Sequence, residues 1–278
     1  MAWIRRELDA LGIPPLKRFG QHFLVDKKVR EVLIELAELT GNDTVLEVGP
    51  GLGFLTSALA ARAGRVIAVE KDRTLAAFLR NKFSSYRNLT IVQGDALTVT
   101  LPEYTKVVSS PPYNISSKLI LLILNSHYKL AALLLQEEFV KRLTASSGSR
   151  DYGRLTVMLQ CRAQAEFITE VPQSAFYPRP RVDSALVTIM PKKEDPPIKD
   201  MELFFDMVRV LFTQRRRRLR GVLTRYLKSR YPQRYGAVLQ RVSPLEKRIF
   251  ETSPEELVNL SNQIADTITE FERDSSGS

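Results

Sequence analysis

The 278-residue sequence contains very little cysteine and histidine. Cys161 is its only cysteine, which excludes a disulfide framework and is typical of a protein kept in a reducing cytoplasm. His22 and His127 are the only histidines, and with a single cysteine they are too few for a Cys/His zinc site. We therefore expect no metal site, and we predict that Cys161 packs as a small hydrophobic residue.

Long apolar runs are also missing. No run approaches the roughly 18–20 residues that cross a bilayer. The first residues, MAWIRRELDALGIPP, contain Glu7 and Asp9 and lack the apolar core of a signal peptide. The length suits a large domain with a smaller one, and the 44% hydrophobic content supports a real core. We expect a cytoplasmic monomer with no membrane partner.

Positive charge, by contrast, is abundant and unevenly distributed. The formal net charge is +10, and segment 209–248 holds 13 Lys or Arg residues against one acid, Glu246. This concentration favours a polyanionic partner, with nucleic acid ahead of a membrane because no strong amphipathic anchor accompanies it. The tract 215–220 is predicted to cover most faces of a helix. The residues expected to bind RNA backbone are Arg215, Arg216, Arg217, Arg218 and Arg220.

Short apolar runs alternate with helix-like stretches over the first half of the chain. The predicted strands are Thr44–Val48, Arg65–Glu70, Leu89–Gln93, Lys106–Ser109 and Leu130–Gln136. Buried strands that alternate with helices, such as 54–63 and 72–83, indicate a parallel, doubly wound α/β sheet. Residues 165–171 and 184–190 are expected to complete the same sheet. Asp26 is predicted to cap a helix that ends at Gly41.

The second half changes character after a proline-rich, charged segment, 191–200, which is predicted to be a linker. Helices are expected over 201–212, 217–229, 244–250 and 253–268. We therefore predict a large α/β domain over residues 1–190, a helical, basic domain suited to binding nucleic acid over 191–270, and a disordered tail over 271–278.

A glycine-rich turn follows the first predicted buried strand, in the motif "VLEVGPGLGFLT". Gly49, Gly51 and Gly53 allow a tight turn and a close approach of the backbone to a ligand. Their spacing is GxGxG, whereas dinucleotide-binding folds have GxGxxG, which disfavours NAD. No P-loop lysine is present to hold phosphates. The turn therefore suits a nucleoside without a phosphate chain.

Acidic residues stand at the ends of the next two predicted strands. Glu70 is placed to accept hydrogen bonds from both hydroxyls of a ribose, and Asp95 from the exocyclic amine of an adenine. An alternative reading is that Asp72 and Asp95 only cap the helices that follow. Since the carboxyl ends of successive strands bind ligands in open α/β sheets, we favour the ligand reading. S-adenosylmethionine satisfies these requirements.

Two adjacent prolines end the strand Lys106–Ser109, in "SSPPYNISS". A turn alone would more often use Gly, Asn or Asp, whereas this pair makes a stiff segment without amide hydrogens. A hydroxyl, a rigid carbonyl and an aromatic ring therefore stand side by side at Ser110, Pro111 and Tyr113.

Five motifs give the chain a resemblance to a known family. "RFGQHFL", "LEVGPGLG", "SSPPYNIS", "FYPRPRVDSALV" and "LFTQRRRRLRGVL" occur in this order, as in KsgA-type rRNA adenine N6,N6-dimethyltransferases. The resemblance implies a Rossmann-like class I methyltransferase sheet, dependent on S-adenosylmethionine, with a smaller all-helical C-terminal domain. It also implies dimethylation of two adjacent adenines near the 3′ end of small-subunit rRNA, with that RNA or a pre-small-subunit particle as partner.

The resemblance also assigns roles to single residues. The catalytic residues would be Ser110, Pro111, Tyr113 and Phe176. The Ser110 hydroxyl and the Pro111 carbonyl would accept both N–H bonds of an adenine N6, and Tyr113 would stack on the base, which contributes roughly 1–3 kcal/mol per base. Phe176 would approach the base from its other side or help to shape the pocket. The cofactor would contact His22, Leu24, Gly49, Gly51, Glu70, Asp95, Ala96 and Ser110. Asn114 is expected to stabilise the turn after the prolines. Ser110 is a departure, because the family usually has Asn there.

Other functions stay open at this point. An Erm-type methyltransferase would act on large-subunit rRNA with nearly the same motifs, although "TQRRRRLRG" is closer to the KsgA type. A DNA adenine methyltransferase would need a module that reads base sequence, and none is evident. A ribosome-assembly or transcription factor could keep the fold without the catalysis. An NAD dehydrogenase is the weakest alternative.

Overall fold

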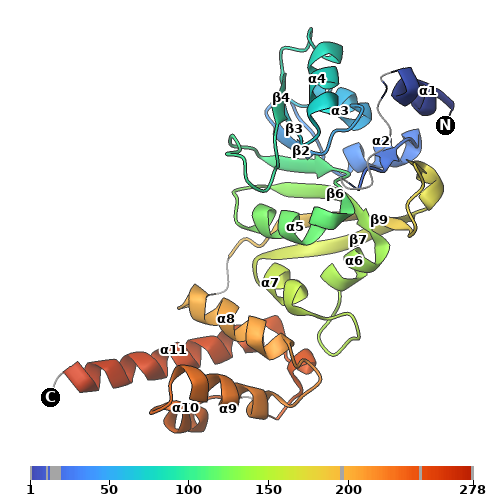
Figure 1. Ribbon diagram of the computed structural model, residues 1–278. Helices are drawn as coiled ribbons and strands as arrows, with labels where there is room; N and C mark the ends of the chain where they lie inside the picture. The colour runs from blue at the N-terminus through green and yellow to red at the C-terminus, as the bar shows by residue number, and fades with distance from the viewer. Residues whose placement is uncertain (1, 11, 13–19, 195–196, 244–245, 277–278) are drawn as a thin grey trace. The chain divides into compact units, whose positions relative to one another are not determined.

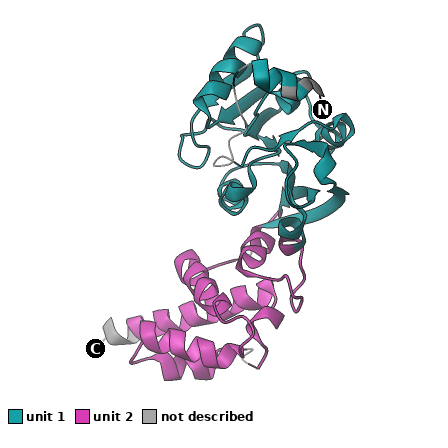
Figure 2. Cartoon of the chain, turned by 45° about the vertical axis from the view of Figure 1, so that its right-hand side comes forward, with its two compact units in different colours: residues 1–141, 163–191 teal, residues 142–162, 192–278 magenta. Residues whose placement is uncertain are grey.

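The chain divides into two compact units (Figures 1 and 2). The structure, a computed structural model, describes residues 2–10, 12, 20–194, 197–243 and 246–276. The sheet unit comprises Met1–Lys141 and Ala163–Pro191, and the helical unit comprises Arg142–Arg162 and Lys192–Ser278. The sequence pattern assigns residues 142–162 to the first domain, but in the structure Tyr152, Val157 and Cys161 pack in the core of the helical unit.

A seven-stranded sheet forms the centre of the sheet unit. In spatial order its strands are β4 (Leu89–Gln93), β3 (Arg65–Glu70), β2 (Thr44–Val48), β5 (Lys106–Ser109), β6 (Leu130–Gln136), β9 (Ser184–Pro191) and β7 (Ala163–Val171). The strands from β4 to β6 are parallel, and β9 runs antiparallel to both β6 and β7. The predicted doubly wound sheet and its two additional strands are confirmed.

Helices cover the sheet because its central strands are apolar on both faces. On one face, α2 (Lys27–Glu35) and α3 (Phe54–Ala60) pack on β2, β3 and β5 through a shared core of Leu33, Ile34, Leu55, Leu59, Val45, Val66 and Val108. The helix α4 (Arg73–Lys82) contacts β3 and β4, and α5 (Ser116–Leu124) follows β5.

Carboxylates fix where two of these helices begin. Asp26 accepts hydrogen bonds from the backbone N–H groups of Lys28 and Val29, which confirms the predicted cap of α2. The helix ends at Glu35, however, six residues before the predicted end. Asp72 caps α4 in the same way, so the capping interpretation of Asp72 is the correct one.

Several short elements of the sheet unit have no clear signal in the sequence. The strands β1 (Phe23–Leu24) and β8 (Phe176–Tyr177) pair antiparallel, with Leu24 opposite Phe176. The helix α1 (Ala2–Ala10) buries Ile4 and Leu8 against Phe23, Leu52 and Leu75. Two 3₁₀ turns, η2 (Tyr113–Ile115) and η3 (Gln173–Ala175), follow β5 and precede β8. The β1–β8 pairing joins segments that are more than 150 residues apart.

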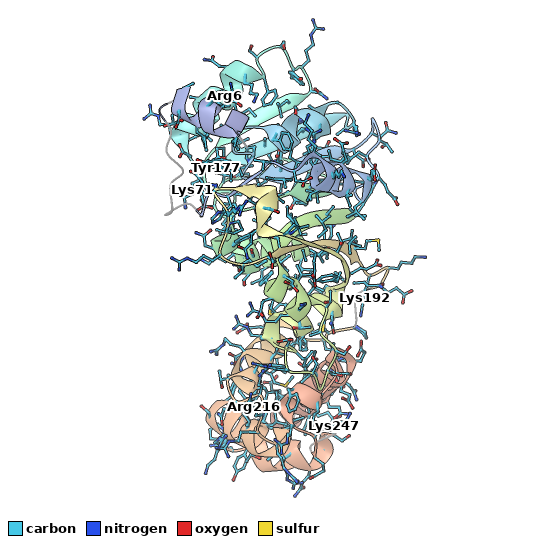
Figure 3. The ribbon with its side chains drawn as sticks, turned by 90° about the vertical axis from the view of Figure 1, so that its right-hand side faces the viewer. Arg6, Lys71, Tyr177, Lys192, Arg216 and Lys247 are labelled. Carbon is cyan, nitrogen blue, oxygen red and sulfur yellow. The ribbon has the colours of Figure 1, made fainter. Side chains whose placement is uncertain are left out.

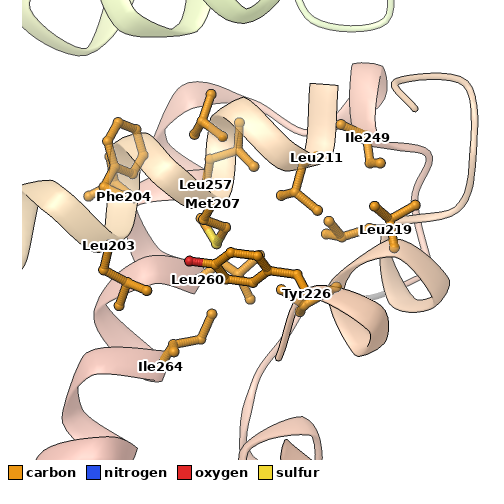
Figure 4. Close-up of a cluster of buried hydrophobic side chains, with 14 of the residues drawn as sticks. Leu203, Phe204, Met207, Leu211, Leu219, Tyr226, Ile249, Leu257, Leu260 and Ile264 are labelled. Carbon is orange, nitrogen blue, oxygen red and sulfur yellow. The ribbon is translucent and has the colours of Figure 1, made fainter. Parts of the chain in front are cut away.

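The helical unit is built around its own apolar core (Figure 4). Its elements are α7 (Arg154–Arg162), α8 (Met201–Phe212), α9 (Leu219–Arg230), α10 (Tyr235–Arg241), η4 (Ile249–Glu251) and α11 (Pro254–Ser276), while α6 (Glu137–Leu143) spans the boundary in sequence between the units. Cys161 is buried in this core, as predicted, and burial raises the pKa of its thiol to about 12.

Three predictions for this half of the chain are wrong. Most of the basic tract 215–220 is not helical: residues 213–218 form the connection between α8 and α9, Arg218 makes a β-bridge with Arg248, and only residues 219–220 belong to a helix, α9. The predicted helix 244–250 is not formed in the described residues: residues 246–248 are not helical, and residues 249–250 belong to the 3₁₀ turn η4. Residues 244–245 lie outside the described residues. The helix α11 extends to Ser276 where a disordered tail was expected, with 277–278 outside the described residues.

Among the helices that the structure describes, none combines the length and the apolarity needed to cross a membrane.

Candidate active site

A pocket lies at the carboxyl ends of the parallel strands, where the strand order reverses. From β2 the chain continues to β3 on one side, whereas β5 lies on the other, and ligands of open α/β sheets bind at such a point. The lining comes from the ends of β2, β3, β4 and β5 and from segment 20–24. All eight residues predicted for the cofactor line it: His22, Leu24, Gly49, Gly51, Glu70, Asp95, Ala96 and Ser110.

The two central strands separate at this pocket, and a buried serine holds them at the point of separation. The paired residues of β2 and β5 are Val45 opposite Lys106 and Leu46 opposite Val107. Beyond it, the Ser109 hydroxyl donates to the carbonyl of Val48 at 2.6 Å and accepts from its N–H at 3.2 Å. The side chain thus satisfies backbone groups that a ladder would otherwise pair, and the strand ends diverge around the pocket.

The backbone of the glycine-rich turn favours glycine at all three of its glycine positions, Gly49, Gly51 and Gly53. Gly49 and Gly51 have φ values of 75° and 58°, in the left-handed region. A Cβ at Gly51 would lie 2.7 Å from the Phe23 ring, and one at Gly49 would lie 3.0 Å from Cδ of Pro112. The turn is therefore packed directly against β1 and against the double proline.

Glu70 lies at the end of β3 with its carboxylate fixed in place. One oxygen accepts from the N–H of Gly51 at 3.1 Å, and the other accepts from the N–H of Asp72 at 2.9 Å. The residue is only 6% exposed, and this burial raises the pKa of its carboxyl group to about 6. Each carboxylate oxygen can accept a further hydrogen bond, so Glu70 can still bind two hydroxyl groups.

Asp95 behaves differently because it is less buried. Its carboxylate accepts from the N–H of Leu97 at 3.0 Å and forms an ion pair with Lys71 at 2.8 Å. The hydrogen bond from Lys71 keeps the pKa of Asp95 below its usual value. The residue supports a local turn and lines the pocket. The interpretation that it caps a following helix is wrong, because residues 94–105, all of them described, contain no helix.

The sequence analysis missed Glu47, which lies within β2 and lines the pocket. It is 1% exposed, and among the described residues its Oε2 has no hydrogen-bond partner. Burial, with the nearby charge of Glu70, raises the pKa of Glu47 to about 8. A buried carboxyl oxygen without a partner is costly and suits a cationic group of a ligand. The sequence did contain a signal for Glu47, because it is an acid inside an otherwise apolar predicted strand.

The double proline brings the predicted acceptor groups to the rim of this pocket. Ser110, Pro111 and Tyr113 all line it, as does Asn114. Ser110 and Tyr113 are half-buried, whereas Asn114 is exposed. The four residues and the cofactor candidates therefore share one cavity.

Tyr113 is held by two contacts. Its hydroxyl lies 2.6 Å from the hydroxyl of Ser184, and its ring faces that of His22 with centroids 6.0 Å apart and planes inclined by 23°. His22 Nδ1 lies 2.8 Å from the carbonyl oxygen of Pro178. Since a carbonyl only accepts, Nδ1 carries the hydrogen of that bond. Arg18 and Phe19, at the start of the same motif, lie outside the described residues.

Phe176 is placed to help shape the pocket, which is the second of the two roles that the resemblance suggested, and not to approach the base. It is 0% exposed, it does not line the pocket, and it packs in the core with Leu24 and Ala175. The reason is its pairing with Leu24 in the β1–β8 sheet. Stacking of Phe176 on a base is therefore incompatible with this arrangement, and its part is to shape the pocket wall through Leu24.

The basic residues of the helical unit divide into bonded and exposed groups. Arg215 donates to the carbonyls of Tyr152 and Arg150, both at 2.6 Å. Arg218 and Arg220 lie 3.6 and 3.7 Å from Glu246, on the exposed surface. In the described part of the chain, no carboxylate pairs with the side chains of Arg216 or Arg217. Figure 3 shows Arg216 and Lys247 on this unit.

Comparison with known proteins agrees with this geometry. A family model described as "Ribosomal RNA adenine dimethylase" matches residues 16–266. The chain belongs to this family. The chain is 41% identical over 260 residues to a Pyrococcus abyssi protein named "Probable ribosomal RNA small subunit methyltransferase A", covering 92% of this chain and 94% of that one. A Methanosarcina mazei protein of the same name is 40% identical over 253 residues, covering 89% and 92%.

Two solved structures show the same fold. A dimethyladenosine transferase from Plasmodium falciparum is 25% identical, with a TM-score of 0.75 and coverage of 91% of this chain and 98% of that one. The 23S rRNA methyltransferase ErmE is 32% identical, with a TM-score of 0.67 and coverage of 87% and 99%. The predicted Rossmann-like class I methyltransferase fold, and with it the predicted family, are confirmed.

Proposed function

We propose that this protein transfers methyl groups from S-adenosylmethionine to N6 of two adjacent adenines near the 3′ end of small-subunit rRNA, forming dimethyladenosine. The single observation that carries this proposal is that Ser110, Pro111 and Tyr113 line the same pocket as Glu70 and Asp95. Family membership and the names of the Pyrococcus and Methanosarcina relatives support the substrate. The expected partner is that RNA, alone or in a pre-small-subunit particle. We also propose that the protein is located in the cytoplasm and acts as a monomer.

The groups that line the pocket fit this cofactor. Glu70, fixed by two backbone N–H groups, would accept from the ribose hydroxyls. Asp95 would accept from the adenine amine, and the unpartnered Oε2 of Glu47 would accept from the ammonium group of the methionine part. An ammonium group would also offset the cost of ionising a buried carboxyl group. S-adenosylmethionine supplies an electrophilic methyl group.

Ser110, Pro111 and Tyr113 would act on the adenine. The lone pair of an adenine N6 is delocalised into the ring, which makes the amine a poor nucleophile. Hydrogen bonds from its two N–H groups to the Ser110 hydroxyl and the Pro111 carbonyl would favour a pyramidal nitrogen whose lone pair is available. Tyr113 would hold the extruded base by stacking. The amine loses its proton to solvent after attack, so the residues contribute positioning and electrostatics.

The exposed arginines of the helical unit would bind the phosphate backbone. Arg216 and Arg217 are the strongest candidates, because the described residues supply no carboxylate for them. The ion pairs of Arg218 and Arg220 with Glu246 are long and exposed, so a phosphate can replace the carboxylate at little cost. Arg215 is a weaker candidate because its guanidinium already binds two carbonyls. Phosphate contacts position the RNA without selecting the base.

A second candidate function is methylation of large-subunit rRNA, favoured by the likeness to ErmE at 32% identity. The two candidates share the pocket and differ only in the RNA. A non-catalytic assembly or transcription factor is disfavoured, because selection for such a role would not require Glu70, Asp95 and Tyr113 to line one cavity.

One experiment separates these functions. The protein is incubated with labelled S-adenosylmethionine and either undermethylated small subunits or large subunits, followed by nucleoside analysis. Label in dimethyladenosine of small-subunit RNA is expected. Label only in large-subunit RNA would favour the second candidate, and no label in either would favour the non-catalytic one.

The pocket is tested by the double variant Ser110→Ala/Tyr113→Ala. We expect it to transfer no methyl group, because both changes remove groups that contact the base. Its affinity for S-adenosylmethionine in calorimetry should fall only slightly, because Ser110 is one of eight predicted cofactor contacts and the other seven are unchanged. Undiminished turnover would exclude the assigned site. Tyr86→Ala is the control, because Tyr86 is a 39% exposed aromatic residue of the same unit that does not line the pocket.

A further inference from the structure

The motif "FYPRPRVDS" contains a buried hydroxyl group that the mechanism above does not use. Ser184 is 0% exposed and does not line the pocket. Its Oγ lies 2.6 Å from the hydroxyl of Tyr113, 71 residues earlier in the chain. Because Ser184 lies behind the pocket wall, its hydroxyl can influence the reaction only through Tyr113.

Ser184 is a rigid anchor because its strand is held from both sides. It is the first residue of β9, opposite Gln136 of β6 and Val171 of β7. The preceding residue, Asp183, accepts from the N–H of Glu137 at its carbonyl and from the N–H of Gln173 at its carboxylate, both at 3.1 Å. Movement of Ser184 would break bonds to both neighbouring strands.

Tyr113, by contrast, lies on a 3₁₀ turn outside the sheet and is half-buried. Its phenol is fixed at the far end by Ser184, and one face of its ring is opposite His22. His22 in turn is bound to the carbonyl of Pro178. Two residues of one motif, Pro178 and Ser184, therefore restrain the same aromatic ring, one through the histidine and one directly.

We propose that Ser184 is a positioning residue whose buried hydroxyl holds the Tyr113 ring in the orientation that stacks on the target adenine. The inference rests on the proposed function, which places the base on Tyr113. A ring whose orientation is fixed holds the bound base closer to the geometry of attack. The motif therefore contributes to catalysis through a residue that never touches the substrate.

The test compares Ser184→Ala with Tyr113→Phe, each of which removes one hydroxyl of the pair. Undermethylated small subunits are the substrate, with S-adenosylmethionine affinity measured by calorimetry. We expect kcat to fall roughly three- to tenfold in both variants, the equivalent of one neutral hydrogen bond. The KM for the particle and the affinity for S-adenosylmethionine should stay unchanged. The double variant should be no slower than either single variant, because both remove the same bond.

A matched control is Thr188→Val. Thr188 lies on β9 four residues after Ser184, on the same face, and is also buried. This change removes a hydroxyl from the same strand without touching Tyr113, so kcat should be unaffected. Melting temperatures of all variants identify any loss of folding, and Tyr113→Phe keeps Ser184 in place if Ser184→Ala is unstable.

The outcomes separate this inference from the proposed function. If Tyr113→Ala abolishes turnover while Ser184→Ala and Tyr113→Phe turn over as the wild type does, the positioning role is wrong and the proposed function stands. If Tyr113→Ala also retains full turnover, the stacking role on which both depend is wrong. If the losses in kcat add up in the double variant, or if Thr188→Val loses as much kcat as Ser184→Ala, then Ser184 has only a structural role.

Discussion

The pocket of the sheet unit and the basic surface of the helical unit hold their charged groups in opposite ways. In the pocket, Glu47 and Glu70 are 1% and 6% exposed, and Glu70 is fixed by backbone N–H groups. On the helical unit, Arg216, Arg217 and Arg220 are exposed. Buried groups act in a low effective dielectric on one small ligand, whereas exposed arginines can adapt to a phosphate backbone.

Substitutions in the two regions should therefore affect different binding properties. A change in the pocket should alter affinity for S-adenosylmethionine and should depend on pH, because the carboxyl groups of Glu47 and Glu70 have raised pKa values. A change on the basic surface should alter affinity for RNA and should depend on salt. Changes that affect both equally would show that the regions are not independent.

The largest effect is expected for Glu70→Gln. The carboxamide keeps one acceptor but loses the charge and places an NH₂ group against a backbone N–H, so affinity for S-adenosylmethionine should fall about a hundredfold. Wild-type affinity should also fall below about pH 6, because protonation of Glu70, whose pKa is raised to about 6, removes an acceptor. Calorimetry between pH 5 and 8 measures both, and RNA affinity at constant salt should not change.

Glu103→Gln is the control for Glu70, since Glu103 is an exposed acid of the same unit outside the pocket. It should bind S-adenosylmethionine as the wild type does. A Glu70→Gln variant that retained wild-type affinity would contradict the assignment of Glu70 to the cofactor.

The basic surface is tested by Arg216→Ala/Arg217→Ala. Affinity for the small-subunit particle should fall roughly tenfold at low salt, and the slope of log affinity against log salt should decrease by about 1 for each lost phosphate contact. Affinity for S-adenosylmethionine and the melting temperature should not change. Filter binding over a salt series provides the measurement, and an unchanged slope would remove these two residues from the RNA interface.

Arg215→Ala separates structure from binding within the same tract. Arg215 ties the carbonyls of Tyr152 and Arg150 to the connection between α8 and α9, so its loss leaves these carbonyls without that donor. We expect the melting temperature to fall by about 2–4 °C with a smaller change in the salt slope than for Arg216→Ala/Arg217→Ala. If Arg215→Ala lowers only the affinity for RNA and not the melting temperature, Arg215 binds RNA as the sequence predicted.

The smallest effect is expected for Glu47→Gln in the absence of cofactor. The pKa of Glu47 is raised to about 8 in the folded state, against an ordinary value of 4.5. Between these values the folded state binds the proton and the unfolded state does not, so the wild type loses stability as pH rises. The melting temperature of Glu47→Gln should therefore exceed that of the wild type by at least about 2 °C at pH 8.5 and approach it at pH 5.

Much of the sheet unit could be predicted because its signals are local. The runs 44–48, 65–70 and 89–93 are short, apolar and separated by helical stretches, and each became a strand with the predicted bounds. Pocket residues at strand ends were found for the same reason. Glu47 was missed because it stands inside such a run, where only the three-dimensional pocket reveals its function.

The errors lie where distant contacts override a local pattern. An arginine-rich tract has adequate helix propensity, but the bridge of Arg218 with Arg248 and the bonds of Arg215 to two carbonyls hold it as a connection. The helix α10 was missed because it buries only Val238 and contains a glycine. Phe176 was expected either to approach the base or to help shape the pocket, and its burial opposite Leu24 leaves only the second role.

The sequence by itself determined the alternation of strands and helices, the glycine-rich turn, and the placement of acids and the double proline at strand ends, because each depends on neighbours within a few residues. Only the tertiary structure decided that Phe176 is buried, that segment 142–162 joins the helical core, and that Ser184 meets Tyr113. These outcomes depend on contacts between residues far apart in the chain, which no local pattern specifies.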